Sequence, residues 1–311
     1  LQGKLGERKL NLLLKKGINR LSMGVQSFNP TILNKAGRLE YTVKQVTNVI
    51  KLAREKGIET INLDFMQDLP GQSLEDIERD LETVANLRPE SITWYRMRLS
   101  DRCVLKQADN QLSEMESLIA KIMVAQALAG YGYIQSSGDR FFLGNSKDVY
   151  KSARSNPRCN MLGLGVSAFS HFEEGVFKNE TSISKYVETV SKGNLPLKTG
   201  RFYSPEEKIV ADLVLSLKGD GVELGKPLRK LIEGKSSEAD YPKAETKKID
   251  LFERYRYIQK IRDLITYKLL EFKGNTLKLT FAGNLLENEI CRQFYSSEID
   301  ALSTAGLNEK I

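Results

Sequence analysis

Gln26, at the end of a segment in which apolar residues alternate with small or polar ones, is the first residue along the chain that is placed to bind a ligand. In the segment 17–29, GINRLSMGVQSFN, two kinds of residue alternate: Leu21, Met23 and Val25 against Ser22, Gly24 and Gln26. This alternation predicts a strand over 20–28. Asn29 and Pro30 then favour the start of a helix, because the Asn side chain can accept from the first amides and Pro has the φ of a first turn. A strand that feeds a helix is the repeating unit of an α/β barrel, whose ligands bind at the carboxyl ends of the strands, so we expect Gln26 on that rim.

The cysteines and the histidine do not have the spacing of a metal site. Cys103, Cys159 and Cys291 are far apart, no CxxC or CxxxCxxC run exists, and the only histidine is His171. Zinc and iron–sulfur clusters need ligands at fixed spacing, so we predict no metal ligands in this chain. Sparse cysteines fit reduced thiols in the cytosol. Cys159 and Cys291 are interpreted as small apolar side chains, His171 as a satisfied strand-end residue, and Cys103 as the thiol to test for reactivity.

Two more strand–helix units follow the first strand. Strands are predicted at 58–65 and 91–99, and helices at 5–16, 30–35, 42–57 and 73–87. Ser73 and Asp76 resemble a capping box at the start of the last of these helices. The order strand–helix–strand–helix–strand indicates parallel strands with right-handed crossovers. The loop 68–72, DLPGQ, is interpreted first as a turn and second as a cofactor loop, because Pro and Gly set its dihedrals.

The pattern changes after the third strand. We predict a helix over 113–129, a loop over 130–158, a Gly-rich strand over 161–172 and helices over 182–191 and 205–217. Further helices are expected near 225–232, 246–264 and 282–294, with a hairpin over 269–279 that turns at Gly274-Asn275. The predicted fold class is α/β. It comprises a partial TIM-type barrel at 1–110, connecting helices and the Gly-rich strand that completes the core at 111–218, and a winged-helix-like domain at 219–311.

Composition describes an ordinary globular chain. Of 311 residues, 41% are hydrophobic and 28% charged, and no apolar run approaches the roughly 20 residues that cross a bilayer. The net charge of +7 permits an anionic partner. Because the basic residues are scattered, composition does not favour nucleic-acid binding. We expect a cytoplasmic protein that does not contact a membrane.

Six colinear segments resemble the oxygen-independent coproporphyrinogen III oxidase family of radical SAM enzymes. They are GINRLSMGVQSFNP (17–30), GR (37–38), NLDFMQDLPGQSLEDIERDL (62–81), LGLGVSAFS (162–170), YSPEEK (203–208) and LTFAGNLLENEICRQF (279–294). Six matches in order are far more specific than one Gly-rich loop. The resemblance implies a barrel that binds S-adenosylmethionine and a [4Fe–4S] cluster. The cluster loop of the family would precede Leu1, so we expect an N-terminally truncated chain that supplies no cluster ligands.

The resemblance also implies roles for single residues. Gln26, Arg38 and Asp64 match polar positions that contact S-adenosylmethionine, and Phe169 matches a position whose backbone lies beside the adenine. Asp64 can accept from ribose hydroxyls, Gln26 can donate and accept, and Arg38 can pair with a carboxylate. Residue type alone leaves other interpretations open, namely a capping or ion-paired Asp64, a surface Arg38 and a Gln26 that satisfies a backbone group. No catalytic residue is assigned.

The implied activity is that of the intact protein. A reduced cluster would cleave S-adenosylmethionine to a 5′-deoxyadenosyl radical, which abstracts hydrogen from a tetrapyrrole or related small molecule. This chemistry requires an electron donor, and we expect a monomer. Where related heme chaperones carry a His-Asn-…-Tyr-Trp stretch, this chain has Arg158-Cys159-Asn160, which argues against heme delivery.

Other functions stay open at this point. Residues 67–70 depart from the usual Tyr-Gly-Leu-Pro of the family, and Arg98 stands where the oxidase has a small residue. The run 175–179, GVFKN, looks closer to relatives that methylate their substrates or open heme anaerobically. A winged-helix nucleic-acid-binding protein and an inactive fragment are the alternatives from other classes.

Overall fold

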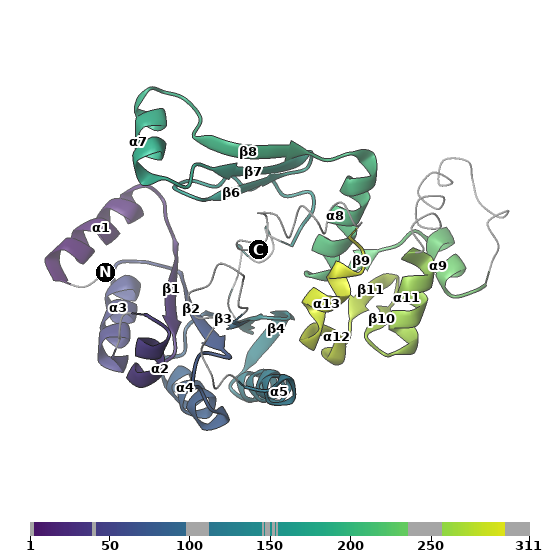
Figure 1. The fold of residues 1–311 in the computed structure, drawn as a ribbon, viewed down its shortest axis with the longest axis horizontal. Helices are drawn as coiled ribbons and strands as arrows, with labels where there is room; N and C mark the ends of the chain where they lie inside the picture. Colours follow the sequence, from purple (N-terminus) through teal and green to yellow (C-terminus); the bar gives the residue numbers. More distant parts are fainter. Residues whose placement is uncertain are drawn as a thin grey trace. The chain divides into compact units, whose positions relative to one another are not determined.

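The computed structural model describes residues 3–38, 42–97, 112–144, 155–235 and 257–295, with the single residues 146, 150 and 153. Arg98 and Cys103 lie outside these residues, as does the first part of the helix predicted at 246–264. The chain divides into two compact units, Leu1–Asp148 and Val149–Ile311 (Figure 1). The three-part division expected from the sequence stays a prediction.

The first unit is built on a five-stranded mixed sheet in the order β1–β2–β3–β5–β4. The elements of this unit are α1 (Gly3–Lys15), β1 (Arg20–Gln26), α2 (Pro30–Lys35), α3 (Val43–Glu55), β2 (Thr60–Gln67), α4 (Leu74–Leu87), β3 (Ser91–Arg96), α5 (Glu114–Gly130), β4 (Tyr133–Ser137) and β5 (Arg140–Leu143). Strands β1, β2 and β3 are parallel, as predicted. Barrel closure stays a prediction.

An antiparallel hairpin extends this sheet where the sequence predicted a loop. Strand β5 pairs antiparallel with both β3 and β4, so the expectation of a loop over 130–158 was wrong for this part. Gly138-Asp139 is a two-residue hairpin turn, and Tyr133 and Phe141 are buried on its two strands. The polar composition of the surrounding residues hid these two apolar anchors.

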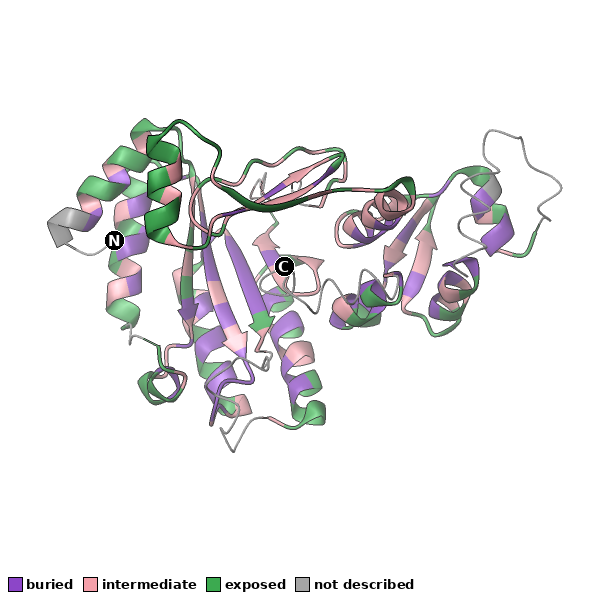
Figure 2. Cartoon of the chain, turned by 45° about the horizontal axis from the view of Figure 1, so that its top comes forward, coloured by how far each residue is buried: buried purple, intermediate pink, exposed green. Residues whose placement is uncertain are grey.

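The helices of the first unit cover one face of the sheet, with α3, α4 and α5 side by side along it (Figure 1). Alternate residues of β2 and β3 are buried in this core: Ile61, Leu63, Phe65, Ile92 and Trp94. The rings of Phe65 and Trp94 stack with centroids 4.8 Å apart. Capping boxes start α3, α4 and α5 at Thr42, Ser73 and Ser113, which fixes where each helix begins. Figure 2 shows the buried residues in purple along the strands and the helices beside them.

The second unit contains two three-stranded sheets, ordered β6–β7–β8 and β10–β11–β9. Its elements are β6 (Phe169–Phe172), β7 (Gly175–Asn179), α7 (Ile183–Ser191), β8 (Leu197–Phe202), α8 (Pro205–Leu217), β9 (Val222–Glu223), α9 (Lys226–Ile232), α11 (Tyr257–Thr266), β10 (Leu270–Lys273), β11 (Thr276–Leu279), α12 (Phe281–Leu285) and α13 (Glu287–Arg292). The hairpin turn at Gly274-Asn275 is confirmed. The winged-helix-like interpretation stays a prediction.

Two elements of this unit differ from the sequence prediction. The Gly-rich strand expected over 161–172 is extended only from Phe169, because the chain turns back at Gly165 (φ 106°) and Ser167 (φ 61°) and Met161 bridges to His171. The closing helix expected over 282–294 is split at Leu286, which has φ −113° and ψ 22°. Local backbone conformations that no apolar pattern encodes caused both differences.

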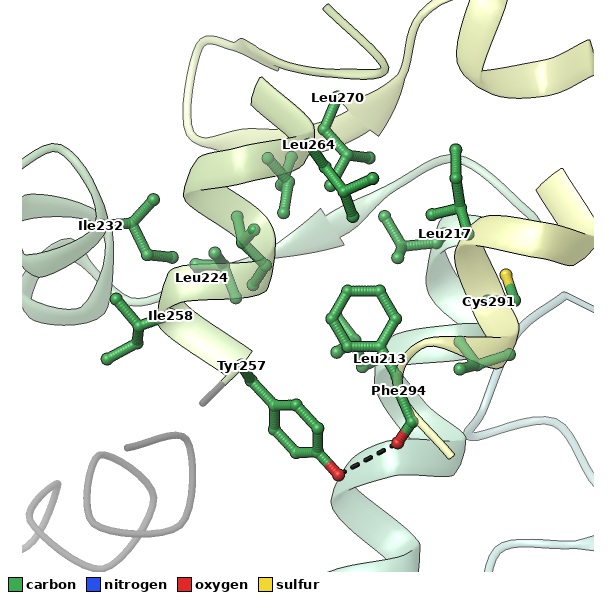
Figure 3. Close-up of a cluster of buried hydrophobic side chains, with 14 of the residues drawn as sticks. Leu213, Leu217, Leu224, Ile232, Tyr257, Ile258, Leu264, Leu270, Cys291 and Phe294 are labelled. Atoms are coloured by element: carbon green, nitrogen blue, oxygen red, sulfur yellow. Dashed lines mark hydrogen bonds between the residues drawn. The ribbon is translucent and has the colours of Figure 1, made fainter. Parts of the chain in front are cut away.

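A separate apolar core holds the C-terminal elements together. Side chains from α8, α9, α11, the β10–β11 hairpin and α13 form it, including Leu213, Leu217, Leu264, Leu270 and Phe294 (Figure 3). The Tyr257 hydroxyl donates to the Phe294 carbonyl at 3.0 Å, which satisfies a polar group inside this core. Among the residues that the structure describes, no helix is long and apolar enough to cross a membrane.

Candidate functional site

Polar side chains gather on the sheet face opposite α3, α4 and α5. Residues paired on neighbouring strands project to the same face, and the pairing aligns Gly24 of β1, Asp64 of β2, Thr93 of β3 and Arg140 of β5 in one row. The adjacent row aligns Ser22, Asn62 and Ser91. The sheet therefore presents an apolar face to the helices and a polar face across its parallel strands.

Asn62 connects the three strands on this polar face. Its Nδ2 donates to Asp64 Oδ1 at 2.7 Å and to Ser22 Oγ at 2.9 Å. Its Oδ1 accepts from the hydroxyls of Ser91 at 3.0 Å and Thr93 at 3.2 Å. Asn62 is 2% exposed, so its amide is buried with both ends satisfied. Asn62 was not among the site residues predicted from the sequence. It lies two residues before Asp64 in an alternating strand, and this spacing was the signal that could have placed it on the same face.

Asp64 is the acceptor at the end of this network. Its second carboxylate oxygen, Oδ2, accepts from the Ser22 hydroxyl at 3.0 Å, and the residue is half-buried. One donor therefore holds each oxygen, which fixes the orientation of the carboxylate. A carboxylate has about four lone-pair sites, so Asp64 keeps capacity to accept from the hydroxyls of a ligand.

Gln26 folds back over the same face. A register shift lies between Gly24 and Gln26, and Gln26 has φ 70°. Its Nε2 lies 2.7 Å from the position that a Cβ on Gly24 would occupy. Because Gly24 pairs with Asp64, the structure brings the Gln26 amide to the face of the sheet that carries the Asp64 carboxylate. No hydrogen bond to the Gln26 side chain is found within the described part of the chain.

The other two predicted site residues lie apart from this pair. Arg38 follows α2, is exposed, and donates its backbone N–H to the Leu33 carbonyl at 2.9 Å. Within the described ranges, no hydrogen bond or ion pair joins its guanidinium to Gln26 or Asp64. Phe169 starts β6 in the second unit, where Lys178 Nζ lies 5.0 Å from the centre of its ring. Gln26, Arg38 and Asp64 thus belong to one unit and Phe169 to the other.

The loop 68–72 is a braced turn. Asp68 has φ 64°, and its Oδ2 accepts from Arg96 Nε at 2.6 Å and from Ser117 Oγ at 2.7 Å. Gln72 closes the turn, because its Oε1 accepts from the Leu69 N–H at 3.2 Å and its Nε2 donates to the Met66 carbonyl at 3.2 Å. The turn interpretation is confirmed, and the role of a cofactor loop stays a prediction.

The remaining titratable candidates lie in the second unit. Burial lowers the pKa of the His171 imidazole, and the backbone of His171 bonds to Met161 in both directions, as expected for a satisfied strand residue. Cys291 is 1% exposed, and burial raises the pKa of its thiol to about 12. Cys291 is therefore a buried apolar residue, as the sequence predicted, whereas Cys159 is only half-buried.

Comparison with known proteins finds relatives among radical SAM proteins. The radical SAM superfamily profile matches residues 2–84, the segment that holds both Gln26 and Asp64. The chain is 24% identical over 302 residues to an oxygen-independent coproporphyrinogen III oxidase of Helicobacter pylori, covering 92% of this chain and 62% of that protein. It is 26% identical over 298 residues to the heme chaperone HemW of Bacillus subtilis, covering 93% of this chain and 73% of HemW.

The fold matches that of a solved structure. Coproporphyrinogen III oxidase (HemN) from Escherichia coli aligns with a TM-score of 0.71 at 21% identity, over 93% of this chain and 66% of that chain. The chain therefore resembles HemN-like radical SAM proteins in sequence, and its fold matches theirs. It spans 55% to 62% of the length of the first curated oxidases that it matches.

The resemblance implies two cofactors, and the described residues fit one of them. Radical SAM proteins use S-adenosylmethionine and a [4Fe–4S] cluster. The exposed, side-chain-free Gly24, the Gln26 amide and the Asp64 carboxylate form a surface with both donors and acceptors, which suits a nucleoside. In the described part of this HemN-like chain, no group of three or more His, Cys, Asp or Glu side chains could hold a metal ion. These residues therefore do not fit the cluster.

Proposed function

We propose that this HemN-like chain binds S-adenosylmethionine on the polar face of β1–β3 and serves radical chemistry on a tetrapyrrole or related substrate. The observation that carries the proposal is the meeting of the Gln26 amide and the Asp64 carboxylate on one face. Both side chains are pre-positioned, Asp64 by Asn62 and Ser22 and Gln26 by its turn over Gly24. Pre-positioned groups bind with less loss of side-chain freedom.

Each predicted residue has a distinct role in this proposal. Asp64 accepts from the ribose hydroxyls, and Gln26 donates to and accepts from the ligand through its amide. Arg38 pairs with the ligand carboxylate, while the role expected for Phe169, in the other unit, stays a prediction. Bound S-adenosylmethionine supplies a 5′-deoxyadenosyl radical in this family, while the protein orients the ligand and excludes water.

Between the activities named for the relatives, we favour the oxidase over the heme chaperone. The segment Arg158-Cys159-Asn160 departs from the His-Asn-…-Tyr-Trp stretch of the chaperones, which removes a histidine suited to heme iron. The proposal therefore includes an enzyme that oxidises its substrate, with a reductant as partner, acting in the cytoplasm as a monomer.

Substitution of Asp64 tests the binding site. We expect Asp64→Ala to weaken binding of S-adenosylmethionine about 10- to 100-fold in isothermal titration, because a hydrogen bond to a charged group contributes about 1.5–3 kcal/mol. Gln26→Ala is expected to weaken binding less, since its amide is neutral. Asp263→Ala, on the exposed side of α11, is the matched control with unchanged affinity. Equal affinity of Asp64→Ala and the unaltered protein would remove Asp64 from the site.

A further inference from the structure

The backbone at Gln26 is strained. Its φ of 70° lies in the left-handed region, which side chains other than Gly rarely adopt. The Ser27 N–H donates to the Val25 carbonyl at 2.9 Å. This hydrogen bond spans three residues and makes Gln26 the centre of a γ-turn of the rare positive-φ type. Such a conformation persists only where the surrounding structure holds it.

Two aspartates of α4 hold the residues that follow this turn. The Phe28 N–H donates to Asp80 Oδ1 at 2.8 Å. The Asn29 side chain donates through Nδ2 to Asp76 Oδ1, also at 2.8 Å. Ser27, which precedes both residues, is fully buried, and its Oγ accepts from the Asn29 N–H at 3.1 Å. The segment 27–29 is therefore anchored to α4 at two points directly after Gln26.

The two carboxylates are four residues apart on α4 and share its buried side. Asp76 is 9% exposed and Asp80 is 2% exposed. Asp76 also completes the capping box of α4, because its Oδ2 accepts from the Ser73 N–H at 3.0 Å. Asp80 has no part in that cap. Burial of a carboxylate is unfavourable, and Asp80 finds a donor in the Phe28 amide, which directly follows the Gln26 turn.

We propose that Asp80, supported by Asp76, is a positioning residue that maintains the γ-turn at Gln26 and so directs the Gln26 amide over Gly24 for ligand binding. Helix α4 carries an acceptor opposite the Phe28 amide, and a change in the turn that moves this amide leaves the buried Asp80 carboxylate without that donor. This inference rests on the proposed function for its ligand, but the position of Gln26 can be measured without any ligand.

The first test observes Gln26 directly in the ligand-free protein. The side-chain amide signal of Gln26, assigned by its loss in Gln26→Ala, is recorded by NMR together with hydrogen exchange at the Phe28 amide. In Asp80→Asn, whose Oδ1 can still accept, we expect an unchanged Gln26 signal and protected Phe28. In Asp80→Ala we expect a shifted signal and at least about tenfold faster exchange. Glu78→Ala, on the exposed side of the same helix, should match the unaltered protein.

The second test connects the turn to binding. Below the melting temperature of every variant, the dissociation constant for S-adenosylhomocysteine should rise about tenfold in Asp80→Ala and return to within about twofold of the unaltered value in Asp80→Asn. An Asp80→Ala protein with a lower melting temperature but an unchanged Gln26 signal and affinity would overturn the inference. If the unaltered protein does not bind the probe, the proposed function fails, while the Gln26 signal still decides the role of Asp80.

Discussion

At the scale of single residues, the sequence predicted which side chains reach the polar face but not what holds them. Gln26 ends β1 and Asp64 lies within β2, and the face on which each lies follows from the period of a strand. The support of Asp64 by Ser22 depends on pairing between strands, across a sequence separation of 42 residues, which no local pattern encodes. The positive φ of Gln26 was hidden for a different reason, because the residue type does not favour it.

Gly24→Ala tests whether the Gln26 amide contacts the ligand. A Cβ at this position would lie 2.7 Å from Gln26 Nε2, at the flexible end of that side chain. The Gln26 amide must therefore move, while the backbone of Gly24 does not need a positive φ. We expect the free energy of unfolding to change by less than about 1 kcal/mol and the affinity for S-adenosylhomocysteine to fall about tenfold by titration.

A second glycine provides the control for this substitution. Gly130, at the end of α5, has nothing within 4 Å of an added Cβ, so Gly130→Ala should change neither binding nor, by more than about 1 kcal/mol, stability. Unaltered affinity in Gly24→Ala would show that the ligand does not need the Gln26 amide in this position.

At the scale of elements, α4 combines three roles of which two were predictable. Its capping box and its apolar side, with Ile77, Leu81 and Val84 buried, follow from residue type and from the helical period. The burial of Asp76 and Asp80 could not be predicted, because acidic residues in helices mostly face solvent. Their partners lie in the loop after β1, and only the packing of α4 against that loop reveals them.

Asp80 is expected to make stability depend on pH. Burial raises its pKa from 3.8 to about 6, with nearby Asp76 adding to the increase and bonds from the Phe28 amide and the Ser27 hydroxyl opposing it. The folded protein therefore holds this proton more tightly than the unfolded chain, and the resulting stability is lost as the pH rises from about 4 to about 6. The difference corresponds to about 3 kcal/mol.

Comparison with Asp80→Asn separates the pH dependence of stability due to Asp80 from the pH dependence due to carboxyls with a lowered pKa, such as Asp76. Urea unfolding of both proteins should give a stability difference that changes by about 3 kcal/mol in favour of the variant between about pH 3 and about pH 7. A difference that stays constant across this range would mean that Asp80 titrates in the folded protein as it does in the unfolded chain.

At the scale of the whole molecule, the order of the elements along the chain was predictable. The composition of each sheet and the division into two units were not. The predicted parallel strands and their intervening helices appear in the first unit, and helices followed by a hairpin appear in the second. The β4–β5 addition to the sheet was missed because a short hairpin in polar sequence carries little periodic signal. Each of the two units has its own buried apolar residues. This division depends on contacts between residues far apart in the sequence, so it could not be predicted from local patterns.

Phe294→Ala tests the core of the second unit. Phe294 is fully buried, and its ring lies 5.7 Å from that of Tyr257. We expect the variant to lose about 3–5 kcal/mol of unfolding free energy and to exchange amide hydrogens faster in α8, α11 and the β10–β11 hairpin. Phe281→Ala, at a residue 52% exposed, should stay within about 0.5 kcal/mol of the unaltered protein. Similar losses in both variants would contradict a core centred on Phe294.

The hydrogen bonds through Asn62 all run in one direction, from the hydroxyls of β3 through the amide to the carboxylate of β2. The proton positions on this part of the sheet are therefore ordered before any ligand arrives, and the outermost group carries negative charge. The Asp64 carboxylate attracts hydroxyl groups and repels phosphate. An unphosphorylated nucleoside is consequently a better match for it than a nucleotide, even where both carry the same base and sugar.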